Sequence, residues 1–271
     1  SAIQLNSSPD VNENLATIER LLITLDTSFD HLVVLPECCL SFGGEESSLL
    51  TLAEDNAQSN QLTQSLGALA IKYGLYLVAG TIPIFVTNTN KYTNSCCVFS
   101  PKGELLTQYD KIHLFDVNVQ DGGCYFESSF TQAGDKVQTV KLPFSHVGLS
   151  VCYDLRFPEL YRSLALLGAE IITVPSAFTK VTGQAHWQAL LQARAIENQC
   201  YVIAAAQQGL HNNGRETWGH SMIISPWGEI IECLPEGPGM ISTDYKPQEI
   251  SRIRQSMPVQ AHNQFNVELK N

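Results

Sequence analysis

Three residues that could act together in nucleophilic catalysis follow predicted strands: Glu37, Lys111 and Cys152. A carboxylate beside a thiol can take its proton as general base, and a nearby ammonium can stabilise the oxyanion formed when sulfur attacks a carbonyl or nitrile carbon. Each residue alone has an ordinary explanation, since lysines are usually solvated and free cysteines are usually buried and inert. The combination points to a hydrolase with a cysteine nucleophile.

Cys152 lies where a strand is predicted to turn sharply into a helix. Apolar and small residues alternate over 146–151, as in a strand with one face on a core. Pro158 suits the first turn of a helix, and Gly168 suits its end. Because a thiol at such a junction can feel the positive end of the helix, we expect Cys152 to have thiolate character.

The other two residues are placed by similar arguments. The apolar run 31–36 is typical of a strand buried on both faces, and it ends in Glu37. A hairpin predicted over 94–111 has Lys111 at its far end. The polar segment 113–134 is predicted to be a long loop, which is often functional, and it contains Glu127.

The two halves of the chain share an order of elements. SPKGELL at 100–106 is matched by SPWGEII at 225–231, and two buried strands at 31–37 and 75–81 are matched at 170–176 and 201–207. Helices are predicted between them at 59–73 and 186–198. We therefore expect a single α/β domain over 1–271, an α-β-β-α four-layer sandwich with an internal pseudo-two-fold repeat. A helix at 246–255 and a polar tail at about 259–271 would complete it.

Composition excludes several classes of function. The net charge is −11, with only 16 Lys and Arg among 271 residues, which disfavours nucleic acid and anionic membranes as partners. A chain this long needs no disulfide framework, and the vicinal pairs Cys38–Cys39 and Cys96–Cys97 lack the spacing of a metal site. We expect no metal and no cofactor. The protein is expected to be cytoplasmic, with an initiator Met or a short, for instance mitochondrial, leader before Ser1 left open.

Several motifs together resemble the nitrilase (carbon–nitrogen hydrolase) superfamily. They are LPE at 35–37, YDKIHLFD at 109–116, VCYDLRFPEL at 151–160, TGQAHW at 182–187 and GHSMIISPWGE at 219–229. The resemblance implies Glu37 as general base, Lys111 as oxyanion stabiliser and Cys152 as nucleophile, with Glu127 beside the substrate amide. It also implies the four-layer sandwich and a homodimer that pairs across an α-layer.

Within the superfamily, the CYDLRFPE and YDKIHLFD motifs resemble the Nit amidase branch. This branch contains deaminated glutathione amidases and omega-amidases, and ARAIENQCYVIAAAQ at 193–207 is more similar to the former. The expected reaction is hydrolysis of deaminated glutathione to 2-oxoglutarate and Cys-Gly. The alternative is an omega-amidase acting on alpha-ketoglutaramate or related dicarboxylic monoamides.

An acidic amide as small-molecule substrate needs a local cation in a protein of this charge. Arg156 is the nearest arginine in sequence to Cys152, and its planar fork matches a carboxylate. The alternative is that Arg156 pairs with Asp154 or Glu159 and braces the turn. The remaining residues that we expect to contact substrate are Tyr153, Phe178, Thr182 and His186.

Two other functions compete with this one. A Cys-His hydrolase could use one of four histidines as its base: His113, His146, His186 or His220. A non-catalytic binding protein on the same fold is the second alternative, and the intact set of Glu37, Lys111 and Cys152 argues against it.

Overall fold

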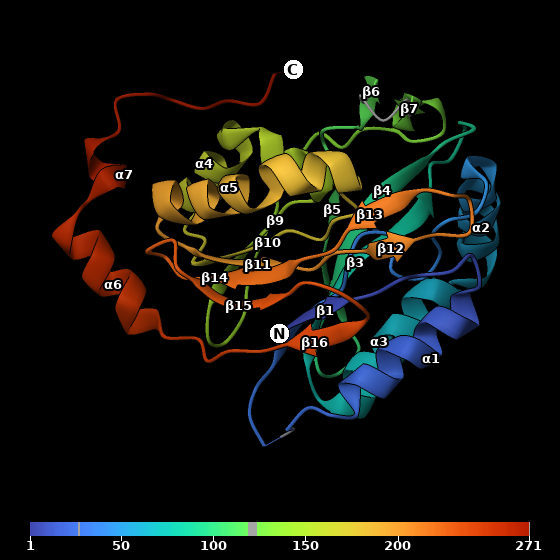
Figure 1. Cartoon of the computed structure of the whole chain (residues 1–271), viewed down its shortest axis with the longest axis horizontal. Coiled ribbons are helices and arrows are strands. Elements are labelled where there is room, and N and C mark those ends of the chain that lie inside the picture. The colour runs from blue at the N-terminus through green and yellow to red at the C-terminus, as the bar shows by residue number, and fades with distance from the viewer. Residues whose placement is uncertain (27, 119–123, 271) are drawn as a thin grey trace.

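Two six-stranded β-sheets form the centre of the molecule (Figure 1). The computed structural model describes residues 1–26, 28–118 and 124–270. The first sheet has the order β16 (Gly239–Ile241), β1 (Ala2–Gln4), β2 (Leu32–Val34), β3 (Tyr76–Phe85), β4 (Tyr92–Phe99), β5 (Leu105–Asp110). The second has the order β15 (Ile230–Leu234), β14 (Ser221–Ile224), β11 (Tyr201–Ala204), β10 (Ile171–Thr173), β9 (His146–Leu149), β8 (Thr139–Lys141).

Helices cover the outer face of each sheet. On the first sheet lie α1 (Val11–Leu22) and α3 (Gln61–Tyr73), whose apolar residues share a core with β1, β2, β3 and β4. On the second lie α4 (Pro158–Leu166) and α5 (Lys180–Asn198), and Figure 1 shows these two pairs on opposite sides of the sheets. The predicted α-β-β-α sandwich is confirmed.

Strands β1, β2 and β4 of the first sheet are buried on both faces, and successive side chains pack into different cores. In β4, Cys96 packs into the core that includes the second sheet, whereas Cys97 packs against the helices outside. This alternation is what the period of two in a strand dictates. All eight cysteines are free; of the two vicinal pairs, Cys39, Cys96 and Cys97 are core residues, whereas Cys38 is only partly buried.

The internal repeat is visible in the strand order. Numbered from one edge, the sheets run β16-β1-β2-β3-β4-β5 and β8-β9-β10-β11-β14-β15, so each buried parallel strand and each hairpin has its counterpart. The matched hairpin turns have the same hydrogen bond. The Ser100 N–H donates to the Glu104 carbonyl at 2.9 Å, and the Ser225 N–H donates to the Glu229 carbonyl at 2.9 Å.

Three segments differ from the sequence prediction. Helix α2 (Glu46–Ser59) was not predicted, because its serines and acidic residues give little apolar periodicity. Helix α5 begins at Lys180, six residues before the predicted start, because the Thr179 side chain caps its N-terminus. The predicted loop at 113–134 contains the two-stranded β6 (Asp116–Asn118) and β7 (Cys124–Phe126) and a 3-10 turn, η1 (Glu127–Ser129).

The C-terminal helix α6 (Pro247–Ser256) agrees with its prediction within one residue. The predicted tail is not wholly irregular, since it begins with the short helix α7 (Val259–His262) before the chain continues without helix or strand to residue 270. Asn271, the last residue of the predicted tail, lies outside the described residues.

The remaining strands, β12 (Gln208–Leu210) and β13 (Glu216–Trp218), pair antiparallel. No helix in the described part of the chain is both long and apolar enough to cross a membrane.

Candidate active site

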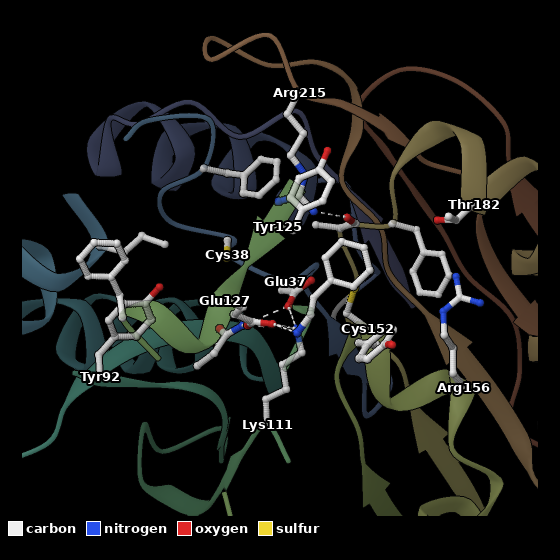
Figure 2. A pocket seen from close by; sticks show the side chains of 18 residues that line it. Glu37, Cys38, Tyr92, Lys111, Tyr125, Glu127, Cys152, Arg156, Thr182 and Arg215 are labelled. Carbon is white, nitrogen blue, oxygen red and sulfur yellow. Dashed lines mark hydrogen bonds and ion pairs between the residues drawn. The ribbon is translucent and has the colours of Figure 1, made fainter. Parts of the chain in front are cut away.

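One pocket brings together the four residues predicted to act in catalysis. Glu37, Lys111, Glu127 and Cys152 all line it, although they come from segments far apart in the chain (Figure 2). Glu37 follows β2, Lys111 follows β5, and Cys152 follows β9 of the other sheet. The pocket is therefore built where strand ends of the two sheets meet.

The Lys111 ammonium is the centre of this arrangement. Its Nζ donates to Glu37 Oε1 at 2.8 Å and to Glu127 Oε2 at 2.8 Å, and the Lys111 side chain is only 2% exposed. The two ion pairs hold both carboxylates beside one buried cation. Figure 2 shows the lysine extended between the two glutamates, with Cys152 beside them.

Asn94 completes this network, and the sequence prediction missed it. Its Nδ2 donates to Glu37 Oε1 at 3.0 Å and to Glu127 Oε1 at 3.2 Å. Its backbone carbonyl accepts from the Lys111 N–H at 3.1 Å. Because β4 and β5 form the hairpin, pairing across that hairpin was the one signal that could have placed Asn94 beside Lys111.

Glu127 reaches the site through the β6–β7 ribbon. Because Asp116 pairs antiparallel with Phe126, the next residue, Glu127, lies beside Phe115. The Phe115 N–H donates to Glu127 Oε2 at 2.7 Å. The second glutamate is thus held by a backbone donor as well as by Lys111.

Glu37 is positioned by a close approach of two strands. A Cβ on Gly80 would lie 2.0 Å from the Pro36 carbonyl oxygen, far inside contact distance. The register of β3 against β4 shifts between Ala79 and Ile82, around this glycine. Only glycine lets the backbone before Glu37 come this near to β3.

Cys152 lies at a sharp junction between a strand and a helix, as predicted, and its backbone there is strained. Its φ is +49°, which is uncommon for a residue with a side chain, and its N–H donates to the Pro175 carbonyl at 2.8 Å. It begins a 3-10 turn, η2 (Cys152–Arg156), which leads into α4. Contrary to the prediction, the preceding strand is buried on both faces, because the small residues at 148 and 150 face α4.

Asp154 stabilises this turn through hydrogen bonds, and the sequence prediction did not include it among the site residues. It is fully buried, and its Oδ2 accepts from the Val151 N–H at 2.9 Å and from the Tyr109 hydroxyl at 2.8 Å. Its Oδ1 accepts from the His113 N–H at 3.1 Å. Asp154 is thus occupied away from Arg156, so the alternative in which Arg156 pairs with Asp154 is wrong.

The resting charges of the site follow from burial and proximity. Burial, and then the nearby Glu37 carboxylate, raise the pKa of the Cys152 thiol well above its usual range. The expected thiolate is therefore wrong for the resting protein. The sequence showed a helix start but not the buried carboxylate next to the sulfur, which opposes a second negative charge.

Burial would lower the pKa of Lys111 and raise that of Glu37, but their attraction reverses both shifts. The Glu127 and Glu37 carboxylates raise the pKa of Lys111 well above its usual range. The Lys111 ammonium, through its charge and its hydrogen bond and with a smaller contribution from the neighbouring Cys152, holds the pKa of Glu37 below its usual value. The site at neutral pH thus contains a thiol, an ammonium and a carboxylate able to take the thiol proton.

Four of the five predicted substrate contacts line the pocket: Tyr153, Arg156, Phe178 and Thr182. His186 is not among the described residues that line it, so its direct contact with substrate stays a prediction without support from the pocket geometry. Its Nδ1 lies 3.2 Å from Nη1 of Arg156, outside the pocket lining. Lining residues that the prediction missed include Phe42, Tyr125 and Arg215.

The geometry gives no support to a histidine base. None of the four candidate histidines is among the described residues that line the Cys152 pocket. His113 stacks on Phe157 with ring centroids 3.7 Å apart, and His220 stacks on Trp218 at 4.0 Å. Within the described residues, no three His, Cys, Asp or Glu side chains gather as a metal site would require.

Comparisons with known proteins show which family the sequence and the fold are similar to. Residues 1–255 match the family model of the carbon-nitrogen hydrolases. The deaminated glutathione amidase of Synechocystis sp. is 43% identical to this chain over 98% of this chain and 97% of its own length. The deaminated glutathione amidase of Homo sapiens is 38% identical over 96% of this chain and 80% of its own length. The crystal structure of the C. elegans NitFhit protein superposes with a TM-score of 0.91 and 32% identity, covering 99% of this chain and 66% of that longer one.

Proposed function

Because the chain belongs to the carbon–nitrogen hydrolase family, we propose that it is the amidase that hydrolyses deaminated glutathione to 2-oxoglutarate and Cys-Gly. The observation that carries the chemistry is the buried Glu37–Lys111–Glu127 network in the same pocket as Cys152. The substrate rests on the relatives named deaminated glutathione amidase and on two arginines in the pocket, which suit a substrate with two carboxylates.

In the proposed first step, the Cys152 sulfur bonds to the amide carbon while Glu37 takes the thiol proton. The Lys111 ammonium stabilises the oxyanion on the former carbonyl oxygen. When the carbon–nitrogen bond breaks, Glu37 passes that proton to the nitrogen of the departing Cys-Gly, which leaves a thioester.

In the second step, Glu37 takes a proton from a water molecule whose oxygen attacks the thioester. The carbon–sulfur bond breaks, the proton returns to the Cys152 sulfur, and 2-oxoglutarate leaves. Glu127 forms a second ion pair with the Lys111 ammonium, beside that of Glu37, and so holds the ammonium at the reacting oxygen. Arg156, whose guanidinium lies 5.3 Å from the Phe178 ring centroid, is proposed to bind the carboxylate of the 2-oxo acid half.

An omega-amidase activity on alpha-ketoglutaramate is the second candidate. That amide has the same acyl half and would use the same Arg156, but its leaving group is ammonia. Wild-type protein should therefore be assayed on both amides, with 2-oxoglutarate as the common product. A higher kcat/KM on deaminated glutathione is expected, and a strong preference for alpha-ketoglutaramate would reverse the assignment.

Arg156→Lys is expected to lose activity selectively, because a lysine keeps the charge but not the two-pronged fork that a carboxylate fits. Activity on both acidic amides should fall more than activity on a neutral amide without the acyl carboxylate. The readout is kcat/KM for each of the three substrates. An equal loss on all three would mean that Arg156 only supports the turn after Cys152.

The pH profile should be flat around neutrality. The lowered pKa of Glu37 means that its carboxylate is lost only as the pH falls below the ordinary value of about 4.3, and the raised pKa of Lys111 keeps its charge as the pH rises. We expect kcat/KM to vary little between about pH 6 and pH 8. An acid limb with a midpoint near 6.5, the usual pKa of histidine, would instead favour a Cys-His enzyme.

We further propose that residues 1–271 act as one domain, since the site needs strand ends from both sheets. The homodimer implied by the family resemblance is proposed to pair across α4 and α5, where Leu167 and Ile196 are about half exposed. Sedimentation of the purified protein would test it. A reducing, cytoplasmic location is supported by the eight free cysteines.

A further inference from the structure

We propose that Arg215 binds the glycine carboxylate of the departing Cys-Gly, and that this residue directs the site toward a dipeptide leaving group. This inference rests on the proposed function, because only deaminated glutathione carries a second carboxylate at that end. It assigns two arginines to two carboxylates: Arg156 to the acyl half and Arg215 to the leaving half.

Arg215 is held in the pocket wall with donor capacity left over. Its guanidinium lies 5.1 Å from the Phe42 ring centroid and 4.9 Å from that of Tyr125, and its Nη2 donates to the Ala177 carbonyl at 3.0 Å. Its Nε is buried and has no hydrogen-bond partner among the described residues. None of the ion pairs among the described residues includes Arg215, so its charge is available for a ligand.

The two arginines occupy different parts of the pocket. Arg156 belongs to the same 3-10 turn as Cys152, and Figure 2 shows it beyond the sulfur, away from Glu37. Arg215 projects from the turn before β13 and lies by Tyr125 in the same view. Burial raises the pKa of Glu37, whereas Lys111, Cys152 and, to a smaller extent, the Arg215 charge lower it. Arg215 is therefore within electrostatic reach of the Glu37 carboxylate.

The chemistry fixes which half of the substrate faces Arg215. Glu37 must deliver its proton to the leaving nitrogen, so the leaving group lies on the Glu37 side of the reacting carbon. Two extended residues span about 7 Å, so the glycine carboxylate lies well beyond Glu37 and needs its own cation in the wall. A planar guanidinium packed against two aromatic rings is already ordered for that contact.

A purely structural role is the competing explanation, since Arg215 also supports the Ala177 carbonyl and two rings. The test compares deaminated glutathione with the same molecule carrying a glycine amide in place of the glycine carboxylate. These two substrates differ only in the charge that Arg215 is proposed to bind. A bracing role would affect both equally, whereas a binding role would change their ratio.

Wild-type protein should have a higher kcat/KM on the free acid than on the glycine amide. Arg215→Gln should reduce the ratio of these two values by about 10- to 100-fold, the range for a hydrogen bond to a charged group. The change should come mainly from a higher KM for the free acid. Arg156→Gln is the matched control. It should slow both substrates and keep their ratio, because the acyl half is common to them.

An unchanged ratio in Arg215→Gln, with both substrates slowed alike, would overturn the role of Arg215 and leave the proposed function standing. A wild-type protein that hydrolyses alpha-ketoglutaramate but neither form of deaminated glutathione would overturn both. Melting temperatures of the variants, compared with wild type, identify any loss caused by unfolding.

Discussion

Cys152→Ala is expected to abolish turnover on every amide, the largest effect of any single substitution in this protein. The sulfur is the only nucleophile proposed to form the thioester, and alanine leaves Glu37 and Lys111 with no group to activate. The fold should survive, because alanine is smaller than the buried thiol it replaces. Steady-state rates, with the melting temperature measured in parallel, check this expectation.

Cys38→Ala is a matched control for that experiment. Cys38 lines the same pocket and, like Cys152, has a positive φ, 53° against 49°. Its variant therefore suffers the same backbone cost but should keep activity of the wild-type order. Turnover that survives in Cys152→Ala, or is lost equally in Cys38→Ala, would contradict the assignment of the nucleophile.

Lys111→Met should reduce kcat by roughly a hundredfold or more, the effect of removing one oxyanion donor in other enzymes. A second effect adds to this one. Without the ammonium, burial raises the pKa of Glu37, and two carboxylates are left close together. Breaking a buried ion pair by removing one partner costs about 3–5 kcal/mol in the free energy of unfolding.

The double variant Lys111→Met with Glu127→Gln separates these two effects. Neutralising Glu127 removes the uncompensated charge, so stability to urea should recover relative to Lys111→Met alone. Activity should stay low because the oxyanion donor is still missing. If kcat recovered together with stability, Lys111 would be a structural residue and not an oxyanion donor.

Much of the fold could be predicted from local patterns, because short motifs in the two halves of the chain show the internal repeat. The paired serine–proline turns at 100–106 and 225–231 identified equivalent hairpins, and the apolar runs before Glu37 and after Gly168 identified equivalent buried strands. Helix α2 was missed because most of its residues are exposed or only partly buried. An exposed helix has little apolar pattern to detect.

The site was predictable only where a residue ends a recognisable element. Glu37, Lys111 and Cys152 meet that condition, whereas Asn94 lies within β4 and Arg215 on a turn. Their roles arise from tertiary contacts with Lys111 and with aromatic rings, which no local pattern records. The protonation state of Cys152 was mispredicted for the same reason, since burial and the Glu37 charge belong to the folded protein.

The position of His186 shows the limit of motif-based assignment. It shares a motif with Thr182, four residues earlier on α5, and residues at that spacing lie on one face of a helix. Thr182 reaches the pocket, but the His186 ring meets the Arg156 guanidinium instead. The shared motif therefore placed both residues on α5 but did not show which of them lines the pocket.

The most direct test of this account is to capture the acyl-enzyme. Wild-type protein mixed with deaminated glutathione, quenched in acid within milliseconds and digested, should give a 2-oxoglutaryl thioester on the peptide that contains Cys152. Alpha-ketoglutaramate should give the same mass increase, because the acyl half is shared. The account would be contradicted if the adduct formed on another cysteine, or if it persisted in Cys152→Ala.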